Sequence, residues 1–233
     1  MDGYMGQALV VDLTKGQFST RTIPEEWFRD YIGGEGVAVR LFKELLDPKL
    51  SAFDPEQPII FATGPLTGTA APTGGRSCIV FRSPATGTLG ASNVGGRFAP
   101  ALKKAGYDLL VVTGRSEKPV FLWIRDDDVQ ILDASDIWGM GVSATEDAVK
   151  AKLDEKGVET ACIGPAGERL VMFAAIMTAK HRAAGRGGAG ALMGSKKLKA
   201  IAVSGSRELP IANQEGLKAK AALARDELFA EAF

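Results

Sequence analysis

The feature that most constrains this fold is a faint internal repeat. Ala62-Thr63-Gly64-Pro65 returns as Cys162-Ile163-Gly164-Pro165, and Val112-Thr113-Gly114 returns as Val203-Ser204-Gly205. The offset between matching residues falls from 100 (62 to 162) to 91 (112 to 203), so the second copy has a shorter middle. Two copies of one unit predict a pseudo-symmetric fold that presents two equivalent loops to a two-part ligand. The alternative is that glycine-rich turns resemble each other by chance.

Apolar periodicity predicts strands and helices in both halves of the chain. Residues 7–13 and 17–23 alternate apolar and polar around Thr14-Lys15-Gly16, which is typical of a β-hairpin. A helix is expected over 143–153, with Ser143 as its N-cap and Glu146 completing a capping box. The other expected strands cover 58–63, 78–82, 109–113, 120–125, 129–132, 160–164, 172–177 and 200–203. The other expected helices cover 24–33, 37–46, 98–105 and the stretch from 213 onward.

Charge and composition limit the classes of partner. The 233 residues include 28 basic and 28 acidic side chains, a balance that favours neither nucleic acid nor a membrane surface as partner. The N-terminus lacks the pattern of a signal peptide, and no apolar run reaches the ~18 residues of a membrane helix. The two cysteines, Cys78 and Cys162, match no C-x-x-C spacing and are expected to be buried, inert thiols. These features predict a cytoplasmic protein whose own thiols cannot hold an iron–sulfur cubane.

Glycine is concentrated in three clusters, at 64–75, 87–96 and 185–194. Glycine lets the backbone approach a ligand closely, and free N–H groups in such turns bind anions. Helix starts expected just after Gly96 and Gly188 strengthen this, and Arg76, Arg182 and Arg186 add donors suited to phosphate oxygens. The clusters therefore predict a surface for a large, multiply phosphorylated ligand. For any one cluster, tight turns packed against a sheet are the alternative.

Other candidate sites in the sequence are weaker. No cluster fits the G-x-G-x-x-G or P-loop pattern, so a dinucleotide or ATP site is not favoured. His181 is the only histidine and has no acidic neighbour in sequence, which favours a structural or solvated role. The run Asp126-Asp127-Asp128 lies between two expected strands, where a solvated turn is more common than a metal site.

Distinctive motifs follow one another in a fixed order at residues 6–14, 31–36, 62–69, 105–108, 163–168, 182–188 and 193–196. In these motifs the chain resembles the aldehyde ferredoxin oxidoreductase family across nearly its whole length. The resemblance implies an α+β N-terminal domain of two β-sheets related by an approximate two-fold, with flanking helices, in agreement with the repeat. Residues 1–210 would form this domain, and 211–233 would begin a following helical domain.

The resemblance also implies a cofactor. In the family, two pterin dithiolenes sit on this domain and hold one tungsten or molybdenum through the cofactor's own sulfurs. A Mg²⁺ bridges the two pterin phosphates through backbone carbonyls, which here would be those of Asn93 and Ala183, one from each copy. Mg²⁺ prefers such oxygen ligands. The family's pterin contacts fall on Arg76, Asn93, Gly95, Arg182, Ala183, Gly185 and Arg186.

The resemblance leaves more than one function open. In the family the 4Fe-4S cysteines and the acid–base residues lie in later domains, so no catalytic residue is expected in this chain. The first hypothesis is the cofactor-binding part of an oxidoreductase that oxidises a small aldehyde to a carboxylic acid and passes electrons to ferredoxin. The second is a non-catalytic pterin-binding subunit or carrier that needs a partner chain, and the third is a generic phosphate- or nucleotide-binding domain. Substrate, metal and oligomeric state stay open, a homo-oligomer included.

Overall fold

Residues 1–231 form two six-stranded β-sheets and seven helices in the computed structural model, which describes that part of the chain. The strands are β1 (Gln7–Asp12), β2 (Gln17–Thr22), β3 (Ile59–Thr63), β4 (Ser77–Arg82), β5 (Leu89–Val94), β6 (Leu109–Thr113), β7 (Val120–Arg125), β8 (Asp128–Asp133), β9 (Glu159–Cys162), β10 (Ile176–Thr178), β11 (Arg182–Ala184) and β12 (Leu198–Ser204). The helices are α1 (Glu25–Tyr31), α2 (Glu35–Leu45), α3 (Phe98–Lys104), α4 (Val142–Leu153), α5 (Pro165–Glu168), α6 (Ala189–Ser195) and α7 (Gln214–Glu231).

The two sheets repeat one topology. The first sheet has the strand order β2-β1-β6-β3-β4-β5, and the second has the order β8-β7-β12-β9-β10-β11. Strands at the same place in the two sheets therefore differ by six in their number along the chain, as β1 and β7 do. One pair in each sheet, β1 with β6 and β7 with β12, is parallel, and the other described pairs are antiparallel. The α+β class and the duplicated unit predicted from the sequence are confirmed.

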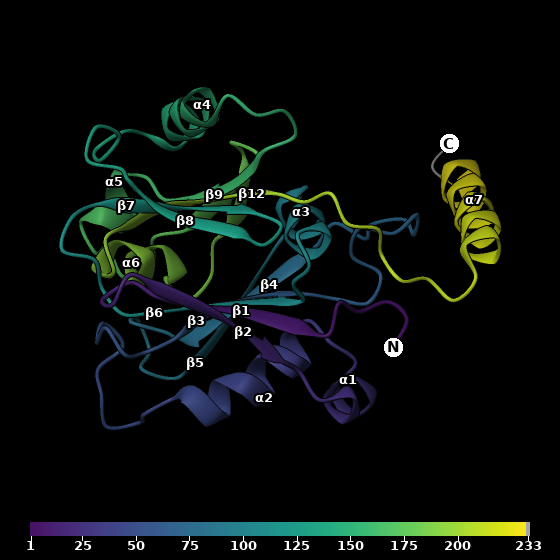
Figure 1. Ribbon diagram of the computed structural model, residues 1–233, viewed down its shortest axis with the longest axis horizontal. Helices are drawn as coiled ribbons and strands as arrows, with labels where there is room; N and C mark the ends of the chain where they lie inside the picture. The colour runs from purple at the N-terminus through teal and green to yellow at the C-terminus, as the bar shows by residue number, and fades with distance from the viewer. Residues whose placement is uncertain (232–233) are drawn as a thin grey trace.

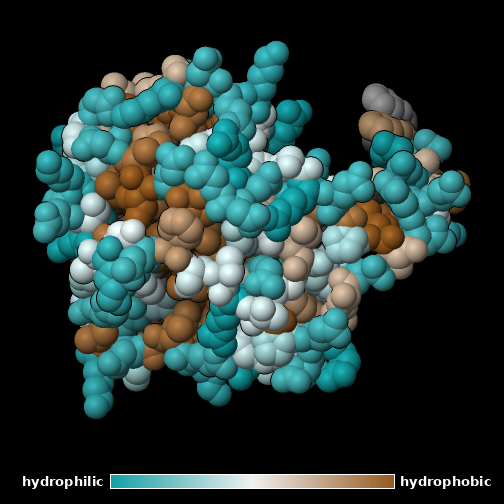
Figure 2. Space-filling model, viewed as in Figure 1, coloured by the Kyte–Doolittle hydropathy of each residue, from teal (hydrophilic) through white to brown (hydrophobic). Residues whose placement is uncertain are grey.

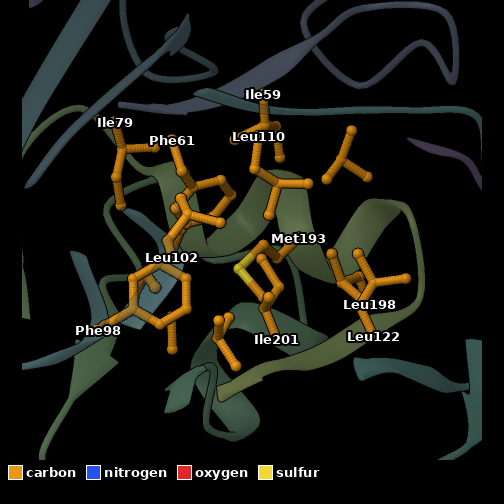
Figure 3. Packing of buried hydrophobic residues seen from close by; sticks show 14 of the residues in the cluster. Ile59, Phe61, Ile79, Phe98, Leu102, Leu110, Leu122, Met193, Leu198 and Ile201 are labelled. Atoms are coloured by element: carbon orange, nitrogen blue, oxygen red, sulfur yellow. The ribbon is translucent and has the colours of Figure 1, made fainter. Parts of the chain in front are cut away.

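The sheets and helices are stacked in layers (Figure 1). α4 covers the outer face of the second sheet, α1 and α2 cover the outer face of the first, and α3 and α6 lie between the sheets. The central core joins the inner faces of both sheets to Phe98 and Leu102 of α3 and Met193 of α6 (Figure 3). Because both copies contribute to this core, burial of the same apolar surface stabilises both halves of the repeat.

The capping expected at the start of α4 is wrong. α4 begins at Val142 with Gly141 as its N-cap, and no side chain caps its backbone N–H groups, so Ser143 lies inside the helix. Glu146 is only 4% exposed and accepts a hydrogen bond from the backbone N–H of Lys180, 3.0 Å away. The carboxylate is thus used in a tertiary contact with the β10–β11 hairpin, which a capping box would not allow.

Two other local expectations differ from the structure. The strand expected over 172–177 begins only at Ile176, because the preceding loop packs against the glycines at the start of α6. A Cβ on Gly190 would lie 2.4 Å from the carbonyl oxygen of Ala175, so this close approach requires glycine. The second glycine cluster, expected as a connection, contains the edge strand β5. The third cluster begins directly after the edge strand β11, which was not expected from the sequence.

Lys196 is a buried lysine whose titration gives a testable dependence of stability on pH. Its Nζ donates to the carbonyl oxygens of Pro55 (2.6 Å) and Gly114 (3.2 Å). Burial lowers the pKa of Lys196 to about 8, and the nearby carboxylates of Glu56 and Asp54 oppose this only in part. The unfolded chain therefore keeps this proton up to about pH 10, whereas the folded chain releases it near pH 8.

We expect the free energy of unfolding to rise by about 3 kcal/mol between pH 8 and 10.5 through Lys196, and to lose this gain as the pH falls back to 8. Urea unfolding of the wild type and of Lys196→Met across this range would measure the effect as a difference between the two proteins. The difference removes the contributions of the other lysines and of the tyrosines. Parallel pH profiles for the two proteins would contradict this assignment.

α7 stands apart from the stacked layers at one side of the molecule (Figure 1). Figure 2 shows it as a separate lobe with a mostly hydrophilic visible surface and a hydrophobic patch where the lobe meets the body. Ala221 is buried at 3% exposure, whereas Leu223, Leu228 and Phe229 are more than half exposed, at 54%, 58% and 68%. None of the helices in residues 1–231 combines the length and the apolar character that crossing a bilayer requires.

Candidate cofactor-binding site

The two edge strands β5 and β11 bring corresponding parts of the two copies together. β5 ends the first sheet, β11 ends the second, and the two strands contact each other. Asn93 on β5 lies opposite the β4 residue that pairs with Ala62, and Ala183 on β11 lies opposite the β10 residue that pairs with Cys162. Since Ala62 and Cys162 are matching residues of the repeat, Asn93 and Ala183 occupy the same position in their sheets. We call the region formed by residues 89–97 and 176–188 the seam.

An open hollow of about 680 Å³ lies at this seam. Three arginines, Arg76, Arg97 and Arg182, line it, and all three are exposed. No arginine of this group forms a salt bridge with a carboxylate in the described part of the chain. The other lining residues are Thr73, Gly75, Gly95 and Gly96. Unpaired guanidinium groups around a glycine-lined hollow have the charge and the hydrogen-bond donors that suit an anion such as phosphate.

The side chain of Arg182 lies across the glycine pair of the other copy. A Cβ on Gly95 would be 3.2 Å from Nη1 of Arg182, and a Cβ on Gly96 would be 3.4 Å from its Cδ. Gly96 also has a φ of +117°, a region that side-chain-bearing residues rarely adopt. These contacts fix the guanidinium of one copy beside the loop of the other, which no spacing in the sequence could show.

The turn that carries Arg182 is itself strained. Ala179 and Lys180 join β10 to β11 with φ values of +47° and +62°, a conformation that costs a non-glycine residue of order 1 kcal/mol. Two contacts from α4 hold the turn: Glu146 accepts the backbone N–H of Lys180, and Asp147 forms a salt bridge of 2.5 Å with the Lys180 ammonium. α4 therefore positions the hairpin on which Arg182 lies.

Hydrogen bonds also cross the seam from each copy to the other. The hydroxyl of Thr178 donates to the carbonyl oxygen of Gly95 at 2.9 Å. The backbone N–H of Arg186 donates to the Ser92 hydroxyl at 3.1 Å, and the Ser83 hydroxyl donates to the carbonyl oxygen of Gly187 at 2.8 Å. The loops at the site are thus held by side chains of the opposite copy.

The sequence comparison decides the family. The model of the aldehyde ferredoxin oxidoreductase N-terminal domain matches residues 8–205. The chain belongs to this family. The resemblance inferred from the motifs is confirmed.

Curated relatives of this aldehyde ferredoxin oxidoreductase N-terminal domain are close in sequence. The tungsten-containing aldehyde ferredoxin oxidoreductase of Thermococcus kodakarensis is 50% identical over 215 residues, which are 92% of this chain and 36% of that protein. The protein of the same name from Pyrococcus abyssi is 48% identical over 92% of this chain and 35% of its own length. An aliphatic sulfonate oxidoreductase, WOR-like subunit, of Pyrococcus furiosus is 37% identical over 90% of this chain and 36% of its own. The chain spans about a third of the length of these oxidoreductases.

A solved structure confirms the fold of the family domain. It is the active site complex BamBC of benzoyl coenzyme A reductase in complex with 1,5-dienoyl-CoA, and the match has a TM-score of 0.93 at 37% identity. The match covers 97% of this chain and 34% of the other.

The structure brings some of the expected cofactor contacts together in the hollow and leaves others outside it. Arg76, Gly95 and Arg182 line one hollow. Asn93 and Ala183 are exposed at equivalent positions of the adjoining edge strands. The two remaining residues, Gly185 and Arg186, are exposed just after β11 and outside the hollow's lining.

Arg97 is a residue of the hollow that the sequence interpretation missed. Its signal was available: it is the arginine that follows Gly95-Gly96 directly and precedes α3. Glycines followed by a basic residue at a helix start are a common arrangement for anions.

The weaker candidate sites behave as solvated or buried groups. Asp127 and Asp128 form salt bridges with Arg207 and Arg125 around the β7–β8 turn, and His181 is exposed in the β10–β11 turn. Among residues 1–231, no group of three or more His, Cys, Asp or Glu side chains is placed to hold a metal ion. Both cysteines are buried free thiols, and burial raises the pKa of Cys78 and of Cys162 to about 12. Such thiols are unreactive near neutral pH.

Proposed function

We propose that this chain binds and orients the tungsten or molybdenum bis-pterin cofactor of an oxidoreductase. The observation that carries the proposal is the meeting of two equivalent edge strands at a hollow lined by unpaired arginines. A cofactor made of two similar phosphorylated halves matches a site made of two similar copies of one fold unit. The exposed guanidinium groups supply donors for its phosphate oxygens.

Asn93 and Ala183 are the residues that we propose hold the bridging Mg²⁺. Both are exposed and occupy one position in the two copies, so their backbone carbonyls are offered in related orientations. Two phosphates close together repel each other, and a divalent cation between them offsets this repulsion. Mg²⁺ usually keeps several waters and takes few protein ligands, which suits two carbonyls and two phosphates.

The bound cofactor would supply the redox chemistry, in which an aldehyde is oxidised to a carboxylic acid with oxygen from water. This chain's own residues bind, orient and neutralise the cofactor, a role that proteins commonly have when the cofactor performs the reaction. The 4Fe-4S cluster, the residues beside the metal and the contact with ferredoxin are proposed to lie in other domains. Residues 1–210 would form the cofactor domain, 211–233 would begin the next, and the intact protein would work in the cytoplasm.

Elemental and pterin analysis of the intact protein, purified without oxygen, tests the proposal. We expect about two pterins, two phosphates and one tungsten or molybdenum per chain, together with Mg²⁺. Protein without pterin would overturn the proposal and favour a generic phosphate-binding domain, for which ATP or NAD would raise the melting temperature. A reading frame that continues into a C-x-x-C-x-x-x-C run would support the enzyme, whereas pterin binding without aldehyde oxidation would support a carrier subunit.

A further inference from the structure

Two buried hydroxyl groups link the proposed cofactor contacts of one copy to the strands of the other. We propose that Ser92 and Thr178 are positioning residues for the cofactor. Each holds in place a loop of the opposite copy that carries a proposed contact, Arg186 for Ser92 and Gly95 for Thr178. The inference rests on the proposed function and adds two residues that do not themselves touch the cofactor.

Thr178 belongs to the second copy and holds the loop after β5 in the first copy. It is the last residue of β10, is 1% exposed, and donates its hydroxyl proton to the carbonyl oxygen of Gly95 at 2.9 Å. A Cβ on the next residue, Gly96, would lie only 3.3 Å from the same hydroxyl oxygen. The loop after β5 is therefore held by one hydrogen bond and by close packing, in a place where water cannot replace the hydroxyl.

Ser92 belongs to the first copy and holds the segment after β11 in the second copy. It lies on β5, is 2% exposed, and its hydroxyl oxygen accepts the backbone N–H of Arg186 at 3.1 Å. Arg186 comes two residues after the end of β11, so this bond fixes the chain where it leaves the edge strand. Its side chain remains exposed and available to a ligand.

The hydrogen bonds of Ser92 and Thr178 run in opposite directions between the two copies, and both lie close to the proposed magnesium ligands. Ser92 is the neighbour of Asn93, and Thr178 pairs across the hairpin with Arg182, the neighbour of Ala183. Mg²⁺ demands near-ideal geometry at ~2.1 Å from each ligand, so small shifts between the two carbonyls weaken its binding. Removing either hydroxyl frees the loop that it holds and should loosen the cofactor, although no cofactor contact is deleted.

The test compares cofactor loss from Ser92→Ala and Thr178→Val with that from the wild-type intact protein in mild urea. We expect each variant to release pterin about fivefold faster, which corresponds to the loss of one ordinary hydrogen bond. We also expect a changed electron paramagnetic resonance spectrum of the metal, which a purely structural role would not produce. Thr178→Ser keeps the hydroxyl and should return both the rate and the spectrum to wild type.

Ser195→Ala and Thr145→Val are the matched controls. Both residues are buried, and their hydroxyls donate to carbonyl oxygens of the second copy itself, so neither hydrogen bond crosses the seam. Release at the wild-type rate from Ser92→Ala and Thr178→Val, or equally fast release from the controls, would overturn the inference while leaving the proposed function intact. A wild-type protein without pterin would overturn both. If Thr178→Val does not fold, Thr178→Ala against Thr178→Ser gives the same comparison.

Discussion

Replacing Arg182 with alanine is expected to strip the intact protein of most of its metal and pterin while its fold persists. Arg182 is exposed, lines the hollow at the seam and has no salt-bridge partner among the described residues, so the substitution leaves no buried charge behind. Hydrogen bonds between charged groups contribute about 1.5–3 kcal/mol each, so cofactor retention should fall at least about tenfold. Arg76→Ala is expected to act in the same direction, since Arg76 lines the same hollow.

Metal and pterin content per folded protein measures this effect, together with the melting temperature. Arg29→Ala is the matched control, because Arg29 is an exposed arginine on α1 whose partner, Asp30, is also exposed. Its cofactor content should equal that of the wild type. Normal metal occupancy in both Arg76→Ala and Arg182→Ala would remove these arginines from the site.

Lys199→Met is expected to destabilise the fold by about 3–5 kcal/mol, because it leaves a buried carboxylate without its cation. The Lys199 side chain is 0% exposed and forms a salt bridge with Glu168, whose side chain is 5% exposed. Lys199 also donates to the carbonyl oxygen of Met140 at 2.8 Å. After the substitution, Glu168 retains only the backbone N–H of Gly139 as a described donor.

Urea unfolding monitored by circular dichroism gives the free energy of each variant. Lys15→Met is the control, since Lys15 and its partner Asp12 form a surface pair whose loss should change stability little. The double variant Lys199→Met/Glu168→Leu should regain part of the loss, because it removes the orphaned charge. An unfolding midpoint of Lys199→Met equal to the wild type would mean that the pair contributes no net stability.

The fold was largely predictable because its signals are local and occur twice. The alternation over 7–13 and 17–23 predicted β1 and β2. The matching motifs at 62–65 and 162–165 predicted the duplicated topology. The weak points were elements whose residues look like loops. β5 is rich in small and polar residues and β11 has three residues, so their strand character comes from pairing with β4 and β10.

The sequence predicted part of the lining of the candidate site, Arg76, Gly95 and Arg182, but not how the site is built. Glycine clusters and arginines marked the segments around Arg76, Asn93 and Arg182, and the family resemblance assigned them a ligand. No pattern in the sequence could show that Arg182 lies across Gly95, or that buried hydroxyls connect the copies, because these contacts join residues some ninety positions apart. Such contacts depend on how the two sheets face each other, which tertiary packing decides.

The helices between the sheets have a consequence for the autonomy of each copy. α3 belongs to the first half of the chain and α6 to the second. Both helices pack in one hydrophobic core together with side chains from the two sheets. A chain divided between β6 and β7 would leave each fragment with the apolar inner face of its sheet exposed to water and with only one of the two helices that cover it. Neither fragment should persist as an isolated monomer in water, and mixing the two should restore a single cooperative melting transition.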